Sequence, residues 1–338
     1  MIQFLGRLST FFGYNNSRFD YTSSFNTVQL CTIKNTEKMK IIITGSLGHI
    51  SKPLTDELVQ KGHAVTVISS KTERKADIEA LGATAAIGTM EDAEFLSATF
   101  KGADVVYVME TLGAGSFMDQ NLDLMAAIAK IGQNYKQAIE QSGVKRVVHL
   151  SSIGAHTGVG NGILAFHYNV ENILKQLPAD VSIKFMRPVG FYYNMFAFIP
   201  TIKTQGAIVS NYGGDNKEPW VSPLDIAAVI AEEIEKPFDG RIVRYIAGDE
   251  VSPNDVAAIL GEAIGNPDLK WIAIADEQML NGMIAAGMNP TIAKGFIEMN
   301  AGRRGGVLYE DYNRNRPTLG KVKLKDFAKE FAAVYNQS

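Results

Sequence analysis

The chain has 338 residues, of which 46% are hydrophobic, and its 33 basic and 36 acidic side chains give a formal net charge of -3. This length can bury the core of one α/β domain with a smaller lobe. The near balance of charge excludes a global field that would recruit nucleic acid or an anionic membrane. The single cysteine, Cys31, precedes the expected fold. The fold is therefore expected to contain no disulfide and no Cys-ligated metal, as suits a reducing cytoplasm.

Residues 1–38 differ from the rest of the chain. They are rich in Phe, Ser, Thr and Asn, show no helical or strand period, and lack the apolar run of a secretory signal. Arg7 and Arg18 suit an organellar transit peptide, but Met39 stands directly before the first expected strand. We expect either a disordered extension or translation that starts at Met39. No stretch approaches the roughly 20 apolar residues that span a bilayer, so we expect no membrane association and a cytoplasmic protein.

The most informative segment is MKIIITGSLGHIS, residues 39–51, in which a short β-branched run ends in a glycine turn and continues into a helical pattern. Gly45 permits the tight turn, and Gly48 removes the Cβ that would block a pyrophosphate. The helix that follows presents free N–H groups to an anion. Ser51 stands where a third glycine is common. A structural turn can also carry two glycines, but the surrounding βα series favours a dinucleotide site. Its expected contacts are Gly45, Ser46, Leu47, Gly48, His49 and Ile50.

Helix and strand alternate after this turn. A helix is predicted over residues 50–61. Buried strands are predicted at residues 63–68, 83–87, 104–109 and 146–150, with amphipathic helices between them. The pattern indicates a Rossmann-type doubly wound parallel sheet with helices on both faces, over residues 39–190. Ligand is then expected at the carboxyl ends of the strands.

The end of the second strand indicates which nucleotide is bound. NAD-specific folds place an acidic residue there, whereas this chain has Ser69, Ser70 and Lys71, with Arg74 one helical turn on. Hydroxyls and cations can receive a 2′-phosphate. We therefore expect NADP, with NADPH preferred and NAD possible. If Lys71 and Arg74 are only solvated residues at the start of a helix, the preference between NADP and NAD stays open.

Beyond Pro188 the alternation loosens, and residues 191–338 are expected to form a smaller substrate lobe, with some segments returning to the Rossmann core. A helix is predicted from Pro223, capped by Ser222, and others over residues 253–264, 276–286 and 325–335. Residues 303–325 lean basic, which we interpret as a solvated face rather than a nucleic-acid site.

The chemical end of the site is expected after the fifth strand, at Ser151 and Ser152. A helix beginning near Gly162 carries His167 and Glu171 four residues apart, on one helical face. The glutamate can then orient or charge the imidazole. Taken alone, such a pair also fits a surface ion pair.

Residues at the end of the fourth strand complete the expected ligand edge. Met109 ends that strand, and Leu112 opens a glycine-containing loop, residues 112–117, that can serve as a lid or simply be flexible. His49 can stack near the pyrophosphate or serve only as a residue that begins a helix, and His149 is expected in the interior. His63 and His156 have no partner in sequence that suggests a metal, so we predict no metal site.

Five motifs occur in order: TGSLGHIS, VKRVVHLSSIGA, the His167 to Glu171 pair, RPVGFYYN and VSPLDIA. With them the chain resembles the NmrA-like group of atypical short-chain dehydrogenases, most closely its NAD(P)H:quinone oxidoreductase-like members, from Met39 almost to the C-terminus. The resemblance implies that His167 and Glu171 replace the Tyr and Lys of ordinary members, with Ser151 or Ser152 near the nicotinamide. Tyr168 does not restore that pair, because Asn172 stands four residues on. Thr89 replaces the Asp that many members use for adenine.

The implied reaction must tolerate loss of the catalytic phenol. A quinone accepts hydride readily, and its oxygen can be protonated by His167 or water, whereas a simple ketone needs a positioned acid. We therefore predict an NAD(P)H-dependent oxidoreductase that acts on a quinone or similar flat electrophile, and a possible homodimer. The adjacent wall is predicted from Phe191, Tyr192, Tyr193 and Asn194, although the same segment suits a buried lobe interface.

Two other functions compete with this one. The NmrA-like group includes redox sensors that bind NADP without turnover and signal to a protein partner. The sensor needs neither an acceptor pocket nor His167, and the joint presence of His167, Glu171 and the aromatic segment favours the enzyme. A sugar-nucleotide epimerase or dehydratase is disfavoured, because that chemistry normally depends on the absent Tyr-Lys base.

Overall fold

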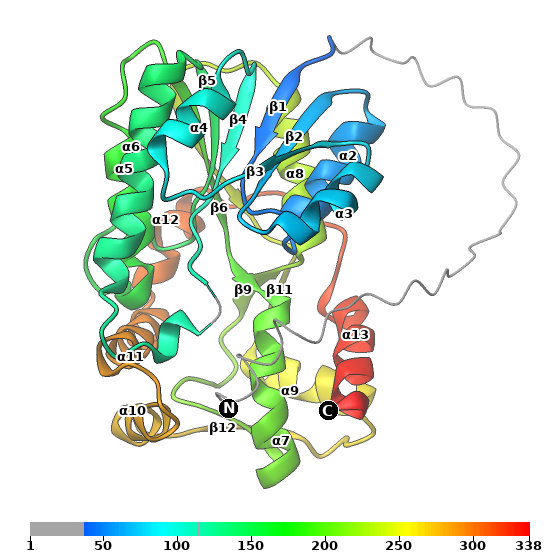
Figure 1. Cartoon of the computed structure of the whole chain (residues 1–338). Coiled ribbons are helices and arrows are strands. Elements are labelled where there is room, and N and C mark those ends of the chain that lie inside the picture. Colours follow the sequence, from blue (N-terminus) through cyan, green and yellow to red (C-terminus); the bar gives the residue numbers. More distant parts are fainter. Residues whose placement is uncertain (1–36, 114) are drawn as a thin grey trace, which may run out of the picture.

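A seven-stranded, wholly parallel sheet forms the centre of the molecule, which confirms the predicted doubly wound parallel fold (Figure 1). The computed structural model describes residues 37–113 and 115–338. In chain order the strands are β1 (Lys40–Ile43), β2 (Ala64–Ser69), β3 (Thr84–Ile87), β4 (Val105–Val108), β5 (Arg146–Leu150), β6 (Ser182–Pro188) and β10 (Arg241–Ile246). Their spatial order is β10-β6-β5-β4-β1-β2-β3, so the chain reverses direction across the sheet beside β1. Ligands of such sheets bind at this switch point, at the carboxyl ends of the strands.

Two helical layers bury opposite faces of the sheet. One layer contains α4 (Ala93–Phe100), α5 (Leu124–Ser142) and α6 (Ala165–Leu174), and the other contains α2 (Ser51–Gln60), α3 (Lys75–Ala80) and α8 (Pro223–Glu235). Alternate strand residues supply the two cores: Ile42 and Val106 face the first layer, and Ile41 and Val105 face the second. The strands read as continuous apolar runs because helices cover both of their faces.

A third core lies in the lobe built from the C-terminal part of the chain. Its small sheets are β11-β9-β7 and β12-β8, formed by β7 (Gly190–Phe191), β8 (Ala207–Ser210), β9 (Glu218–Val221), β11 (Asp249–Val251) and β12 (Lys270–Ala273). Its helices are α7 (Ile199–Gln205), α9 (Pro253–Ala263) and α13 (Leu324–Gln337). Phe196, Trp271 and Phe331 fill this core. α10 (Asp276–Ala285) and α11 (Pro290–Arg304) pack instead on the first core of the main sheet, and the short α12 (Glu310–Arg314) packs on the second. α8 and β10 return to the main domain.

The expected elements are confirmed with ends that differ by one or two residues. The strand over residues 146–150 matches β5, and the Ser222 side chain caps α8 by accepting a hydrogen bond from the Leu224 N–H. β6, β10, α7, α11, α12 and the short strands of the lobe were not predicted. Lys184 and Arg187 interrupt the apolar pattern of β6, and both are buried in the folded chain. The expected extension lies outside the described residues, except for residues 37 and 38.

Candidate functional site

The glycine turn leaves β1 at the carboxyl edge of the sheet and enters α2. Gly45 has φ +87, and a Cβ there would lie 2.7 Å from Ser51 Oγ, so only glycine fits without strain. At Gly48 a Cβ would lie 3.1 Å from the Gly45 carbonyl oxygen. Ile50, at the N-cap of α2, is buried and provides no side-chain cap for the first N–H groups of the helix. The turn therefore has the cradle that a pyrophosphate requires, and no side chain caps the helix terminus behind it.

Ser46 holds this turn against the second strand. Its φ of 54 is unusual for a residue with a side chain, and two bonds support it: Ser46 N–H donates to the Ile68 carbonyl, and Ser46 Oγ donates to Ser69 Oγ at 2.9 Å. Ser69 is buried and also accepts from the Lys71 N–H. The expectation that the Ser69 hydroxyl receives a 2′-phosphate is therefore not met, because this hydroxyl already joins two segments of the fold. Leu47 packs on the neighbouring core.

Exposed polar residues follow Ser69. Ser70 and Lys71 are exposed, and Arg74 lies 3.4 Å from Asp77 in a pair that remains open to solvent. Thr89, after β3, is also exposed, and its hydroxyl accepts from the Glu91 N–H. Ser70, Lys71 and Arg74 form the lip of the expected nucleotide site. This lip therefore carries two cations, Lys71 and Arg74, and one hydroxyl.

The end of β4 contributes structural polar contacts. The Met109 N–H donates to Thr44 Oγ1, and the Met109 carbonyl accepts from the Tyr135 hydroxyl at 2.6 Å. Leu112 is half-buried and packs against the first core. Its loop was expected either to serve as a lid or simply to be flexible; Gly113 and Gly115 are exposed, and residue 114 lies outside the described residues.

His149 on β5 is an interior histidine, as predicted. Its Nε2 lies 3.1 Å from both carboxylate oxygens of Glu110, and both side chains are fully buried. Its Nδ1 is buried and has no hydrogen-bond partner among the described residues. The pairing with Glu110 could not be predicted from a local pattern, because 39 residues separate the two.

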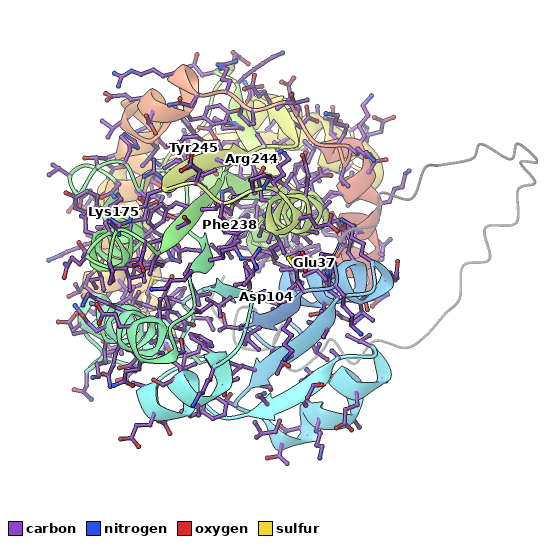
Figure 2. All side chains as sticks on the ribbon, turned by 90° about the horizontal axis from the view of Figure 1, so that it is seen from above. Glu37, Asp104, Lys175, Phe238, Arg244 and Tyr245 are labelled. Carbon is purple, nitrogen blue, oxygen red and sulfur yellow. The ribbon has the colours of Figure 1, made fainter. Side chains whose placement is uncertain are left out.

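Glu171 is the centre of a buried charged network. It accepts hydrogen bonds from Ser151 Oγ at 2.6 Å, from Arg187 Nε at 2.8 Å and Nη2 at 2.7 Å, and from Lys175 at 3.0 Å. Burial alone would raise the pKa of Glu171, but the bonds from Arg187 and Ser151 outweigh it and lower that pKa. Lys175 is the most exposed of these partners and follows the last residue of α6 (Figure 2).

Arg187 extends the network to the C-terminal part of the chain. Its Nη1 donates to Asp311 at 3.0 Å and to the Tyr245 hydroxyl at 3.2 Å, and Tyr245 donates to Asp311 at 2.7 Å. Burial opposes the charge of the guanidinium, but Glu171 raises its pKa above the ordinary value. Arg187 was not predicted as a site residue, although a lone arginine at the end of an apolar strand was a signal for it.

His167 lies one helical turn before Glu171 but is not oriented by it. The oxygens of Glu171 are occupied by Ser151, Arg187 and Lys175, and His167 Nδ1 is buried with no hydrogen-bond partner in the described part of the chain. Its ring packs against Phe166 at 4.0 Å between centroids. Burial, and next the charge of His149, lower the pKa of His167 to about 3. The imidazole is therefore neutral, and the expectation that Glu171 charges it is not met. Ser152 is half-buried beside this network.

The aromatic segment after β6 is divided between two environments. Tyr193 stacks on His49 of the glycine turn at 4.8 Å and lies 5.3 Å from the Phe191 ring. These three rings connect the nucleotide turn with the lobe. Tyr192 instead faces the lobe core, where it packs on Phe327 and donates to the Val322 carbonyl, and Asn194 is exposed. Phe191 and Tyr193 therefore remain in the expected wall, whereas Tyr192 belongs to the lobe interior.

The described residues contain no group of three or more His, Cys, Asp or Glu side chains that could hold a metal ion. Of the helices in this part of the chain, none is long and apolar enough to cross a membrane.

The fold and the glycine turn place this chain in the class of Rossmann-type α/β proteins. The sequence pattern of the NmrA-like family matches residues 37–304. The chain therefore belongs to the NmrA-like family, as its motifs predicted.

Three similar proteins illustrate the range of this family and fold. NAD(P)H azoreductase of Xenophilus azovorans is 24% identical over 261 residues, which are 77% of this chain and 86% of that protein. The uncharacterized sugar epimerase YhfK of Bacillus subtilis (strain 168) is 31% identical over 220 residues, which are 62% of this chain and 95% of that protein. The NADPH-dependent quinone oxidoreductase QOR2 of Escherichia coli, solved with NADPH, superposes with a TM-score of 0.71 at 19% identity, over 86% of this chain and 99% of that one.

Proposed function

We propose that this protein is an NADPH-dependent oxidoreductase that reduces a quinone or a similar flat electrophile. The observation that carries the proposal is the place of His167, which lies on α6 one helical turn from Glu171 and whose Nδ1 is buried without a hydrogen-bond partner among the described residues. Burial lowers the pKa of this imidazole to about 3, which leaves it neutral. A neutral imidazole can donate a hydrogen bond to a developing oxyanion but is a poor source of a proton. That property suits an acceptor whose reduced oxygen is stable as an anion until water protonates it.

The residues at the glycine turn fit the nucleotide. Gly45 and Gly48 leave the space that a Cβ would fill, and α2 begins without a side-chain cap. Lys71 and Ser70 would hold a 2′-phosphate, with Arg74 beside them, because all three lie on the exposed lip. When bound there, NADPH supplies the hydride. The NADPH bound by QOR2 and the NAD(P)H for which the azoreductase is named support the same cofactor.

Other residues would organise the acceptor end. Phe191 and Tyr193 provide flat surface against which an aromatic ring can pack. Ser151 donates to Glu171, and that carboxylate is held ionised by Arg187, so neither group has a proton available at neutral pH. We assign Glu171 and Ser151 a positioning role, because they fix α6 and thereby His167 against β5. The predicted catalytic role of Glu171 thus becomes an indirect one.

The sensor remains the second candidate, and one observation favours it. The described site offers no charged acid, since Glu171 is ionised and its pKa is lowered by Arg187 after the opposing effect of burial. A protein that binds NADPH and signals its redox state needs no proton donor. Turnover is the property that separates the two functions.

The test measures NADPH oxidation by absorbance with 2-methyl-1,4-naphthoquinone and the full-length protein. We expect quinone-dependent turnover, and a fall of roughly 100-fold in kcat for His167→Ala, the typical cost of removing one oxyanion donor. His156→Ala is the matched control, because both of its ring nitrogens lack partners among the described residues. Tight NADPH binding without turnover with any quinone or dye would favour the sensor.

A further inference from the structure

A second polar cluster lies in the lobe, and neither the fold nor the proposed chemistry accounts for it. Glu218 and Trp220 stand two residues apart on β9, so their side chains project from the same face of the small sheet. Arg303, near the end of α11, covers this face: its guanidinium carbon lies 4.3 Å from the Tyr212 ring centroid and 5.2 Å from that of Trp220. Its side chain is 12% exposed, so the expectation of a solvated basic face is wrong for Arg303.

The arginine is held rigidly. Its Nε donates to the Tyr309 hydroxyl at 3.1 Å and lies 3.4 Å from Glu218 Oε2. Gly190 leaves room for it, since a Cβ there would lie 3.1 Å from the Trp220 ring and 3.5 Å from Arg303 Nη2. An arginine plane fixed by aromatic rings is well prepared to bind an anionic oxygen, because little conformational entropy remains to be lost.

Two polar atoms of this cluster are buried and have no hydrogen-bond partner in the described chain. They are Trp220 Nε1 and Glu218 Oε2. Glu218 Oε2 lies in the ion pair with Arg303, whereas the indole N–H has no partner of either kind among the described residues. An unpaired buried N–H costs about 1–3 kcal/mol, so its presence beside Arg303 requires a reason. The indole nitrogen can only donate. Burial raises the pKa of Glu218, although Arg303 and a hydrogen bond with Tyr309 act in the opposite direction. The guanidinium and the indole N–H together form a set of donors that an oxygen-rich group would satisfy.

The cluster lies next to the proposed acceptor site. Gly190 directly precedes Phe191 of the aromatic wall. The end of α11 packs on the loop that follows Ser152, where a Cβ on Gly302 would lie 2.0 Å from the Gly160 carbonyl oxygen, and one on Gly154 would lie 3.0 Å from Leu308. A substituent on a ring held at Phe191 could therefore reach Arg303.

We infer that Arg303 and Trp220 form a subsite for an anionic ring substituent, a carboxylate or a sulfonate, of the acceptor. Arg303 is its specificity-determining residue and forms the ion pair with the substituent, Trp220 donates to a remaining oxygen, and Glu218 holds the guanidinium in place. This inference rests on the proposed function for the identity of the ligand as an acceptor. The ligand chemistry itself rests only on the donors of the cluster.

Direct binding tests the inference without requiring turnover. The full-length, NADPH-loaded protein is titrated calorimetrically with 2-naphthoate and with its neutral analogue 2-naphthamide. We expect 2-naphthoate to bind at least about ten-fold more tightly, the usual gain from a charge-assisted bidentate contact. Equal affinity, or tighter binding of the amide, overturns the inference in the unmodified protein and therefore independently of any variant.

Two variants locate the effect. Arg303→Lys keeps the charge but not the planar fork, so we expect the affinity for naphthoate to fall at least about five-fold more than that for naphthamide. Glu218→Gln keeps the shape of the side chain but removes the negative charge beside Arg303, so we expect it to retain or strengthen naphthoate binding. Equal losses of both ligands in Arg303→Lys, or loss of naphthoate binding in Glu218→Gln, would assign the cluster a structural role only.

Turnover then separates this inference from the proposed function. If naphthoate is preferred but no quinone is reduced, the subsite stands and the reductase proposal fails. If 2-methyl-1,4-naphthoquinone is reduced and the preference for naphthoate is absent, the reductase stands and the subsite fails.

Discussion

The two ends of the candidate site are built in opposite ways. At the glycine turn, Gly45 and Gly48 keep side chains out of the cradle, and the helix that follows begins without a side-chain cap. At α6, by contrast, Glu171 is enclosed by donors that come from residues 16 and 20 positions away in sequence. The first end is prepared for a ligand, whereas the second uses its charges to hold the fold. The hydrogen-bond partners of a polar residue near a site therefore determine whether its side chain can act on a ligand.

The largest effect is expected from breaking the enclosed end. Arg187→Leu removes the main partner of a buried carboxylate, and we expect the free energy of unfolding to fall by about 3–5 kcal/mol, measured by urea denaturation. Lys175→Ala is the control: it removes the half-exposed partner of the same carboxylate and should cost less than about 1 kcal/mol. Similar losses in the two variants would show that the network does not depend on the buried pair.

Breaking the open end should affect binding. Gly45→Ala places a Cβ 2.7 Å from Ser51 Oγ in a left-handed backbone, and we expect NADPH affinity to fall at least about ten-fold, measured by fluorescence titration. Gly62→Ala, after α2, has a similar φ of +90 with nothing within 4 Å, so it tests backbone strain alone. Equal weakening of NADPH binding by both variants would place the effect in strain rather than in the cradle.

A smaller effect is expected at the lip. Lys71→Ser should reduce the ratio of NADPH to NADH affinity by about five- to ten-fold, because it removes one charge-assisted contact to the 2′-phosphate. Lys75→Ser, on α3, is the matched control, since that side chain is exposed and lies 3.9 Å from Glu79. An unchanged ratio in Lys71→Ser would leave the cofactor preference to Ser70 and Arg74.

The smallest expected effect concerns pH: we expect kcat to show no titration of His167. A histidine whose pKa is lowered to about 3 is deprotonated throughout the neutral range, so raising the pH removes no proton from it. We expect kcat to stay level between roughly pH 5 and 8, where an ordinary imidazole would titrate. A kcat that falls as the pH rises through 6.5, and does so only when His167 is present, would restore the protonated imidazole as the acid.

The contrast between the two ends also explains which residues could be found from the sequence. The glycine turn is readable because its geometry depends on the backbone freedom of Gly45 and on a strand and helix directly beside it. The parallel sheet is readable because strands covered on both faces are apolar throughout. Ser69 was misread, since its type and position suit a phosphate, while its real partner, Ser46, is decided by how two loops pack.

The acceptor end depended on contacts across long stretches of chain. The HxxxE spacing correctly placed two residues on one helix, but it could not show that Arg187 and Ser151 claim the glutamate. Likewise, the excess of basic residues over residues 303–325 could not show that Arg303 packs against Tyr212 and Trp220.

The sequence by itself determined the family, the doubly wound sheet and the turn that is expected to bind the nucleotide, because these follow from local backbone freedom and from the period of apolar residues. Only the tertiary structure decided the charge state and the partners of the polar side chains. Burial and the approach of distant residues set those properties, as in His167, whose pKa is lowered first by burial and next by the charge of His149 on β5.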